Sequence, residues 1–356
     1  MISLIKSNPQ TSVKKLKNLL KEDALLMKKV KQVRALLLRH LGQNYAFDGC
    51  MAYLMECINE KPEYDYWFFS DVIGDSFTQV YSDELVTGCL SDITDRVKNA
   101  FTACGYEYSI VNKDDLKENE VYQKIISYID KNIPVIQRKL INSRYEYSII
   151  CGYDDNNTYN IYILKGGTNQ VQKTEFNDSE SFIFIGNKVT DPNIKDVYRN
   201  LILSISEYLN MSPKDGFIFG KNAFKSWADS LIDGRFDNMP LNKINKNKYH
   251  TNYLINAGTN GCARGALERA ILLNPDMIFI KRLQYHYDNM QQVFDYLAYT
   301  DGKDSLDYQS GGLYGGFKIK PKTFKNQNEM KDLSCKIEEF VFECDRILNI
   351  FDSLNT

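Results

Sequence analysis

One cysteine in this sequence, Cys50, lies at a predicted helix start and is a candidate catalytic nucleophile. Cys50 follows Gly49 and opens an apolar run with helical spacing that includes Ala52 and Leu54. A helix N-terminus carries partial positive charge, which lowers the pKa of a thiol placed there. Gln43 precedes the cysteine, and a side-chain amide can hold the oxyanion that forms during acyl transfer. The pattern predicts a catalytic Cys50 assisted by Gln43; the alternative is a buried core cysteine.

Strands that could frame such a site follow later in the chain. Alternating and β-branched residues predict strands at 133–140, 145–153 and 158–165. The cysteine block, Pro-Val-Ile at 134–136 and the strand ending in Gly-Tyr-Asp at 152–154 resemble the papain-like superfamily. The chain is most similar to the N-terminal domain of the butirosin-pathway aminoacyl transferase and to the double-glycine-leader peptidases. The resemblance covers residues 40–190 and implies a papain-like α+β domain.

The chain departs from this family at the catalytic base. The resemblance puts the family's histidine at Glu146 or its neighbours Tyr145 and Tyr147, and none of the three is histidine. A catalytic cysteine needs a base beside it and a group that orients the base. Glu146 or Tyr147 is therefore the candidate for an unusual partner. The sequence does contain histidines elsewhere. His250 and His286 lie in its second half, and they could complete the site only if that half folds back over it.

Two further residues are candidates for substrate binding. The aromatic stretch 64–69 resembles a bacterial branch of the same group, and Trp67 lies within it. Arg264 lies among small residues at a predicted helix start, where an anionic group could bind. The small residues at 261–266 could equally serve close helix packing. The glycines at 311–316 predict either a mobile lid or a plain flexible linker.

Three functions follow as hypotheses. The first is cysteine-dependent acyl transfer or peptide processing by Cys50 with a degenerate triad, on a small-molecule or peptide substrate that a carrier protein could deliver. The second is a catalytically inactive papain-like module that binds a small metabolite or peptide. The third is a regulator that docks through basic helices in residues 1–40, which contain ten Lys or Arg and two acids.

The composition of the chain argues against several classes of binding partner. The net charge of −2 gives no global field for nucleic acid. Eight scattered cysteines without a CxxC pair predict neither a metal cluster nor a disulfide framework, so no metal or cofactor is expected. The sequence shows no signal peptide and no apolar run of membrane-spanning length, which predicts a cytoplasmic protein without membrane contact. It leaves the oligomeric state open.

The length of 356 residues predicts more than one folded unit. We expect a basic helical segment at 1–40, a papain-like α+β domain at 41–190 with a mixed or antiparallel sheet, and a helical domain at 191–356. Asp191-Pro192-Asn193 marks the boundary between the last two. Helical patterns are predicted at 92–104, 119–131, 193–209, 219–232, 259–273, 276–300 and 328–352.

Overall fold

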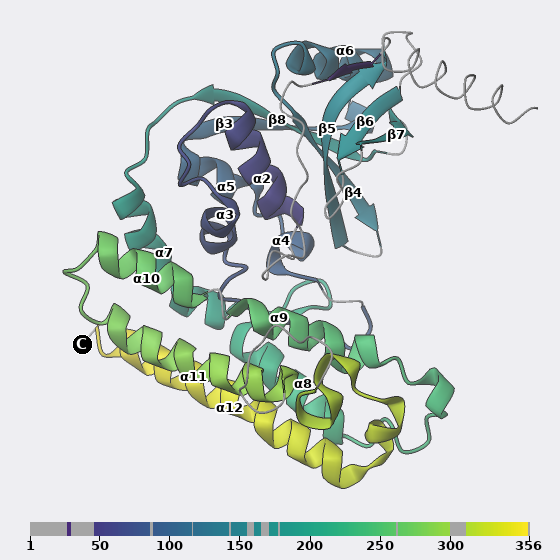
Figure 1. The fold of residues 1–356 in the computed structure, drawn as a ribbon, viewed down its shortest axis with the longest axis vertical. Helices are drawn as coiled ribbons and strands as arrows, with labels where there is room; N and C mark the ends of the chain where they lie inside the picture. The colour runs from purple at the N-terminus through teal and green to yellow at the C-terminus, as the bar shows by residue number, and fades with distance from the viewer. Residues whose placement is uncertain are drawn as a thin grey trace, which may run out of the picture.

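The computed structural model describes residues 27–29, 46–85, 88–115, 117–141, 144–154, 160–164, 171–176, 179–260, 263–299 and 311–354. Figure 1 shows two parts, a sheet with helices packed around it and a set of long helices below. Strands dominate the middle of the chain and helices its last third. The fold class is therefore α+β, as the sequence predicts.

An antiparallel sheet forms the centre of the first part. Its strands lie in the order β3-β8-β4-β5-β6-β7, and each strand runs antiparallel to its neighbours. A short strand β1, Met27–Lys29, pairs with the end of β5 beyond the residues that pair with β4. The other bounds are β3 Tyr106–Asn112, β4 Val135–Ile141, β5 Arg144–Asp154, β6 Asn160–Leu164, β7 Val171–Glu175 and β8 Ser181–Lys188.

Strand β5 is the centre of this part. Its residues are buried from Tyr147 to Asp154 without alternation. Helices α2, α4 and α6 all pack against it, which removes the solvent face that an antiparallel strand often keeps. The helices around the sheet are α2 Ala46–Cys57, α3 Tyr66–Ile73, α4 Leu90–Ile93, α5 Val97–Cys104 and α6 Glu118–Ile129.

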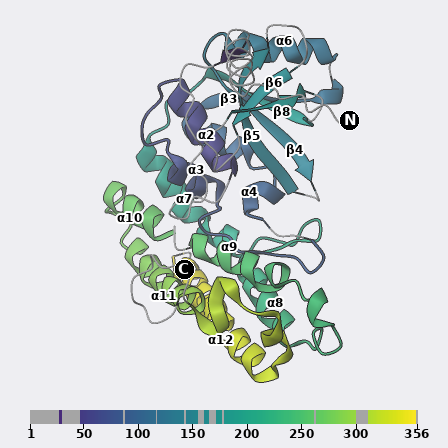
Figure 2. The same cartoon turned by 45° about the vertical axis from the view of Figure 1, so that its right-hand side comes forward.

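Long helices build the second part. Helix α12 packs along α8 and α11, and Figure 2 shows the three lying side by side. The connection between α8 and α9 contains the π-helical turn η4, Asn247–Thr251, which continues directly into α9. The helix bounds are α7 Ile194–Leu209, α8 Gly220–Ile232, α9 Asn252–Asn260, α10 Ala263–Leu273, α11 Ile280–Ala298 and α12 Gln327–Asp352.

The two parts are joined by more than the linker near residue 191. Strand β2, Val80–Tyr81, pairs antiparallel with β9, Ile218–Phe219. The side-chain amide of Gln79 donates to the carbonyl of Tyr253 at 3.1 Å, and the Tyr253 hydroxyl donates to the carbonyl of Ser82 at 2.6 Å. We call residues 74–85 and 88–92, with the α9 residues that they contact, the junction.

The prediction of one continuous helix at 92–104 is wrong, because the structure has two helices in this region. Thr94 is extended, so α4 ends at Ile93 and a second helix, α5, begins at Val97. The predicted stop is confirmed, since Gly105 caps α5 with a φ of 80°. The predicted helix at 259–273 is likewise two helices, α9 and α10.

Other elements were not predicted. Helix α3 forms in the aromatic stretch 64–69 and beyond it, where no helix is predicted from the sequence; Asp65 caps its start by accepting the Phe68 N–H at 2.7 Å. Residues 27–29 form a strand, which corrects the helix predicted there; the rest of 1–40 lies outside the described residues. Where the sequence suggests a lid or linker at 311–316, Gly312 and Gly316 pack against the end of α11 at Leu297 and Ala298, too closely for a Cβ.

Helix α12 offers a matched pair of phenylalanines to test this packing. Phe340 is fully buried and stacks on Phe224 of α8 with ring centroids 4.6 Å apart. Phe342, on the same helix, is 59% exposed. We expect Phe340→Ala to lower the free energy of unfolding by about 3–5 kcal/mol, because it leaves a cavity. Phe342→Ala should change it by less than about 1 kcal/mol. Urea denaturation measures both, and equal losses would contradict the packing described.

Candidate functional site

Cys50 lies inside α2 rather than at an exposed helix start. It is the fifth residue of α2 as the structure describes that helix, so it lies in the second turn. Its side chain is fully buried, within the core shared by α2, α3 and the sheet. Helix-terminal polar effects fall off within the first turn. Gln43, the predicted oxyanion donor, lies outside the described residues.

The surroundings of the thiol hold it protonated. Burial raises the pKa of Cys50, and the carboxylate of Asp48 raises it further. Only a thiolate acts as an efficient nucleophile. Cys50 therefore has the properties of a structural cysteine in this conformation.

Strand β5 carries the two candidates for the missing base, and only one of them faces α2. The Tyr147 ring lies 4.7 Å from the ring of Phe47 in α2 and is 5% exposed. Glu146 is exposed, in register with Lys139 of β4. The alternation of a strand explains the difference. The Tyr147 hydroxyl donates to the carbonyl of Ser91 at 3.3 Å.

Neither described histidine is a partner for Cys50. His250 is fully buried against the Trp227 ring, with centroids 5.3 Å apart and no hydrogen bond at either nitrogen. Burial lowers the pKa of His250 to about 4, so this ring is neutral. His286 bonds through Nδ1 to Glu343 at 2.7 Å, between α11 and α12. Within the described part of the chain, no imidazole completes a pair with the cysteine.

The two predicted substrate-binding residues lie on helices other than α2, Trp67 on α3 and Arg264 on α10. Trp67 is half-buried in α3, with its ring edge-on to Tyr66 at 5.0 Å. Arg264, near the start of α10, is 56% exposed and pairs with Glu268 at 3.1 Å and Asp288 at 3.5 Å. These carboxylates already neutralise the guanidinium, so Arg264 is poorly placed to receive another anion.

Sequence reasoning missed a group of buried carboxylates beside the cysteine. Asp48 comes from α2, Asp75 follows the cap of α3, and Asp92 comes from α4. They are 0%, 1% and 9% exposed. We call these three residues the acidic cluster. A detectable signal was an acid inside an apolar run, as in Ala46-Phe47-Asp48, because charged residues are rarely buried without partners.

Hydrogen bonds satisfy the acidic cluster only in part. Asp75 accepts the N–H of Ser91 at 3.0 Å through Oδ1, while its Oδ2 has no partner. Asp92 pairs with Arg144 of β5 at 3.3 Å. Asp48 makes no hydrogen bond of normal length, and the Ser70 hydroxyl is the neighbouring donor that lowers its pKa. Buried polar atoms are usually hydrogen-bonded in folded proteins, so the carboxyl groups of the cluster are only weakly satisfied.

Burial and mutual repulsion keep protons on the cluster. Burial raises the pKa of Asp48 well above its ordinary value; Asp75 and Asp92 raise it further, and the Ser70 hydroxyl opposes them. Burial raises the pKa of Asp75 to about 7, despite the bonds that it accepts from Ser91. Burial has the same effect on Asp71, whose pKa is about 7. At neutral pH the cluster is therefore only partly ionised.

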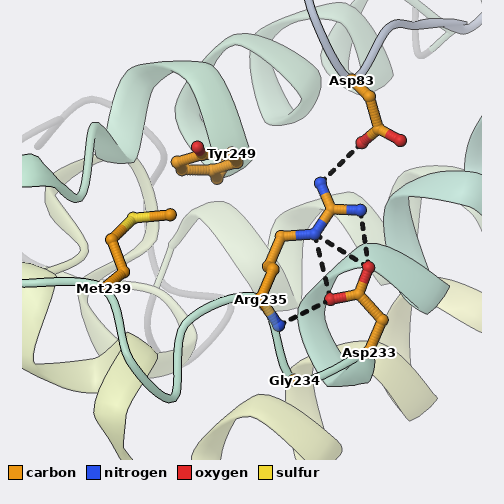
Figure 3. A pocket seen from close by; sticks show the side chains of 6 residues that line it. All are labelled: Asp83, Asp233, Gly234, Arg235, Met239 and Tyr249. Carbon is orange, nitrogen blue, oxygen red and sulfur yellow. Dashed lines mark hydrogen bonds and ion pairs between the residues drawn. The ribbon is translucent and has the colours of Figure 1, made fainter.

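A separate hollow of about 510 Å³ lies on the surface of the helical part (Figure 3). Arg235 crosses it and bonds both Asp233 and Asp83, while Tyr249 and Met239 line its other side. The guanidinium is bonded by two carboxylates, so this hollow has no charge left to recognise an anion. Its walls are distinct from those of the acidic cluster.

A scan against protein-family models finds no match to this chain, and a search of curated proteins finds none. Among the described residues, no helix is both long and apolar enough to span a membrane. The site must therefore be interpreted from its own geometry.

The acidic cluster predicts a pH dependence of stability. Asp75 holds its proton to about pH 7 in the folded chain, against an ordinary pKa of 3.8. The folded state then binds more protons than the unfolded state in this range, so the free energy of unfolding that Asp75 contributes falls as pH rises. We expect the stability advantage of the wild type over Asp75→Asn to fall by about 1–3 kcal/mol between pH 5 and pH 8.

Urea denaturation of both proteins at several pH values measures this difference. His250, whose pKa is lowered to about 4, acts in the opposite direction but is common to both proteins and cancels. Asp114→Asn, at an exposed position, is the control and should leave the pH dependence unchanged. A difference between wild type and Asp75→Asn that stays constant with pH would show that Asp75 is ionised throughout.

Proposed function

We propose that this protein is a binding module with a papain-like plan in which Cys50 performs no chemistry. One observation carries the proposal: the Cys50 side chain is fully buried and its thiol pKa is raised by burial and by Asp48. A papain-like enzyme depends on the opposite, an accessible thiol with a lowered pKa. The tyrosine at the position of the base, Tyr147, is itself buried, and its pKa is raised well above the ordinary value.

The ligand we propose is a small metabolite or a peptide bound at the junction. Ligand sites occur preferentially where two parts of a fold meet. Polar side chains concentrate there: Ser76, Thr78 and Gln79 are all 2% exposed or less. Polar contacts between parts, such as the Asn256 amide to the Gly88 carbonyl at 3.0 Å, allow rearrangement more readily than an apolar interface.

Cysteine-dependent acyl transfer is the second candidate. The observation that favours it is the contact between α2 and β5, which brings Tyr147 to the helix that carries Cys50. This function requires a rearrangement that exposes the thiol and supplies a base. The reactivity of Cys50 in the folded protein separates the two candidates.

We expect Cys50 to resist alkylation in the folded protein. Iodoacetamide reacts with accessible thiolates, so exposed Cys335 should be labelled between pH 7 and pH 9 while Cys50 is not. Peptide mapping by mass spectrometry assigns each site, and labelling of Cys50 should appear only in denaturant. Cys335→Ser is the matched control, because it removes the expected fast site without touching the core.

Labelling of Cys50 at pH 7, at a rate equal to or above that of Cys335, would refute the inactive module. Acyl transfer by Cys50 would then be the better hypothesis. Mutation of Tyr147 to Phe would next show whether the phenol influences the rate.

A further inference from the structure

The outer side of helices α11 and α12 carries exposed aromatic side chains. Tyr285 and Tyr296 of α11 are 62% and 55% exposed, and Phe342 of α12 is 59% exposed. A single exposed apolar residue is ordinary, but a group on one face marks an interaction site. A hollow of about 530 Å³ lies between the two helices, and Tyr296 and Phe342 both line it. We call this hollow the α11–α12 groove.

The two helices lie antiparallel, because contacts join the start of one to the end of the other. Phe279, just before α11, has its ring centroid 6.0 Å from that of Phe351. At the other end, the Lys336 ammonium lies 4.7 Å from the centroid of the Tyr296 ring. Helix α12 runs along the lower edge of the molecule in Figure 1.

Each helix directs one stripe of exposed or half-buried side chains away from the core. The residues of each stripe are three or four positions apart, which is the repeat of one helix face. The stripes are Tyr285, Asn289, Gln292 and Tyr296 on α11, and Cys335, Glu339, Phe342, Arg346 and Asn349 on α12. Their exposure shows that no element in the described part of the chain covers this side. It is therefore open to a partner.

The charges on α12 are complementary to themselves about Phe342. Arg346 follows Phe342 by four residues, and its side chain is 59% exposed although it bonds Glu343 at 2.8 Å. Glu338 and Glu339 precede Phe342 by four and three residues. When two copies of a helix pack antiparallel about a twofold axis at one residue, the position four after it faces the position four before it. An axis at Phe342 therefore brings Arg346 of each copy to the two acids of the other.

We infer that two copies of this chain form a dimer through α12, with the helices antiparallel and the twofold axis at Phe342. The two Phe342 rings meet at the axis, each at the edge of the other copy's α11–α12 groove. The twofold axis repeats every contact, so the Arg346 contacts with acids form on both sides of the rings. This interface goes beyond the proposed function and does not depend on what the protein binds.

The charge balance of the groove favours a second copy over a strongly charged partner. Its lining contains two cations, Lys336 and Arg346, and two acids, Glu339 and Glu343. A lining with equal numbers of both signs does not select a nucleic acid or an acidic peptide, which need an excess of positive charge. Both signs in an order that is complementary on twofold rotation suit the same surface of another copy.

The dimer is expected to be weak. One helix and the edge of a groove make a small contact, and charged residues surround its aromatic centre, as in reversible interfaces. We expect a dissociation constant of roughly 10–100 µM. At about 1 µM the protein is then monomeric. Denaturation of Phe342→Ala and labelling of Cys335 at that concentration report on the single chain.

Sedimentation velocity of the full chain over a range of about 1–500 µM measures the dimer. We expect the weight-average mass to rise with concentration toward twice that of one chain. Phe342→Arg should raise the dissociation constant at least tenfold, because it brings two like charges together at the axis. Leu272→Arg on α10 is the matched control, since Leu272 is 82% exposed and lies outside the proposed interface. It should dimerise as the wild type does.

Charge reversal tests the antiparallel arrangement. Arg346→Glu places an acid against the acids of the second copy, and the double variant Glu338→Arg with Glu339→Arg places cations against Arg346. Each should dimerise at least tenfold more weakly than the wild type. An equimolar mixture of the two should form a heterodimer about as tight as the wild-type dimer, because every reversed charge then faces its opposite. Circular dichroism checks the folding of each variant.

Three outcomes would overturn the inference. The first is a monomer at every concentration, which would leave the α11–α12 groove to a different protein. The second is a dimer that Phe342→Arg does not weaken, or that Leu272→Arg weakens equally. The third is the absence of a heterodimer when both charge-reversal variants are folded. Arg346 also bonds Glu343, so Phe342→Arg decides the matter if Arg346→Glu does not fold.

Discussion

Helix α2 packs so closely against β5 and α3 that every residue from Phe47 to Met51 is buried. Most of these side chains are apolar, and burial stabilises them. Two are not, because Asp48 and Cys50 lie on the same buried turns. A charge in that setting would cost several kcal/mol, so burial raises the pKa of both groups. The chemistry open to the site follows from this packing.

Buried polar groups are also found at the junction, where the first part of the molecule meets the second. Loop residues next to Asp75 are polar yet buried, and one of them, Gln79, donates its amide N–H to the Tyr253 carbonyl of helix α9. A polar network in a low-dielectric setting is strong where it is satisfied and costly where it is not. The hydrogen bonds from Gln79 and Tyr253 therefore tie the loop after Asp75 to the second part of the molecule.

The sequence predicts the regular elements well. Alternation predicts β4 and β5, and helical spacing predicts α7, α8, α11 and α12 to within a few residues. It does not predict α3, because the run of aromatic residues at 64–69 has no clear period. Met27–Lys29 was predicted as part of a helix, but pairing with β5 decides its conformation.

The candidate site was harder to predict than the fold. The sequence identifies the helix of Cys50 and the strand of Tyr147, which are in contact in the structure. It could not show that the thiol is closed off, because α2 is apolar on most sides and its exposure depends on what packs around it. The acidic cluster is formed by three separate elements, so only the tertiary fold reveals that its carboxyl groups meet.

The pairing of β2 with β9 also has a consequence for synthesis on the ribosome. Residues 80 and 81 leave the exit tunnel long before their partners at 218 and 219. At ordinary rates of translation the interval of roughly 140 residues corresponds to about 7–30 s. During that time the polar loop before β2 has neither its strand partner nor the Tyr253 carbonyl to bond. Strand β2 and the polar loop before it must therefore wait, partly hydrated, for the C-terminal half of the chain.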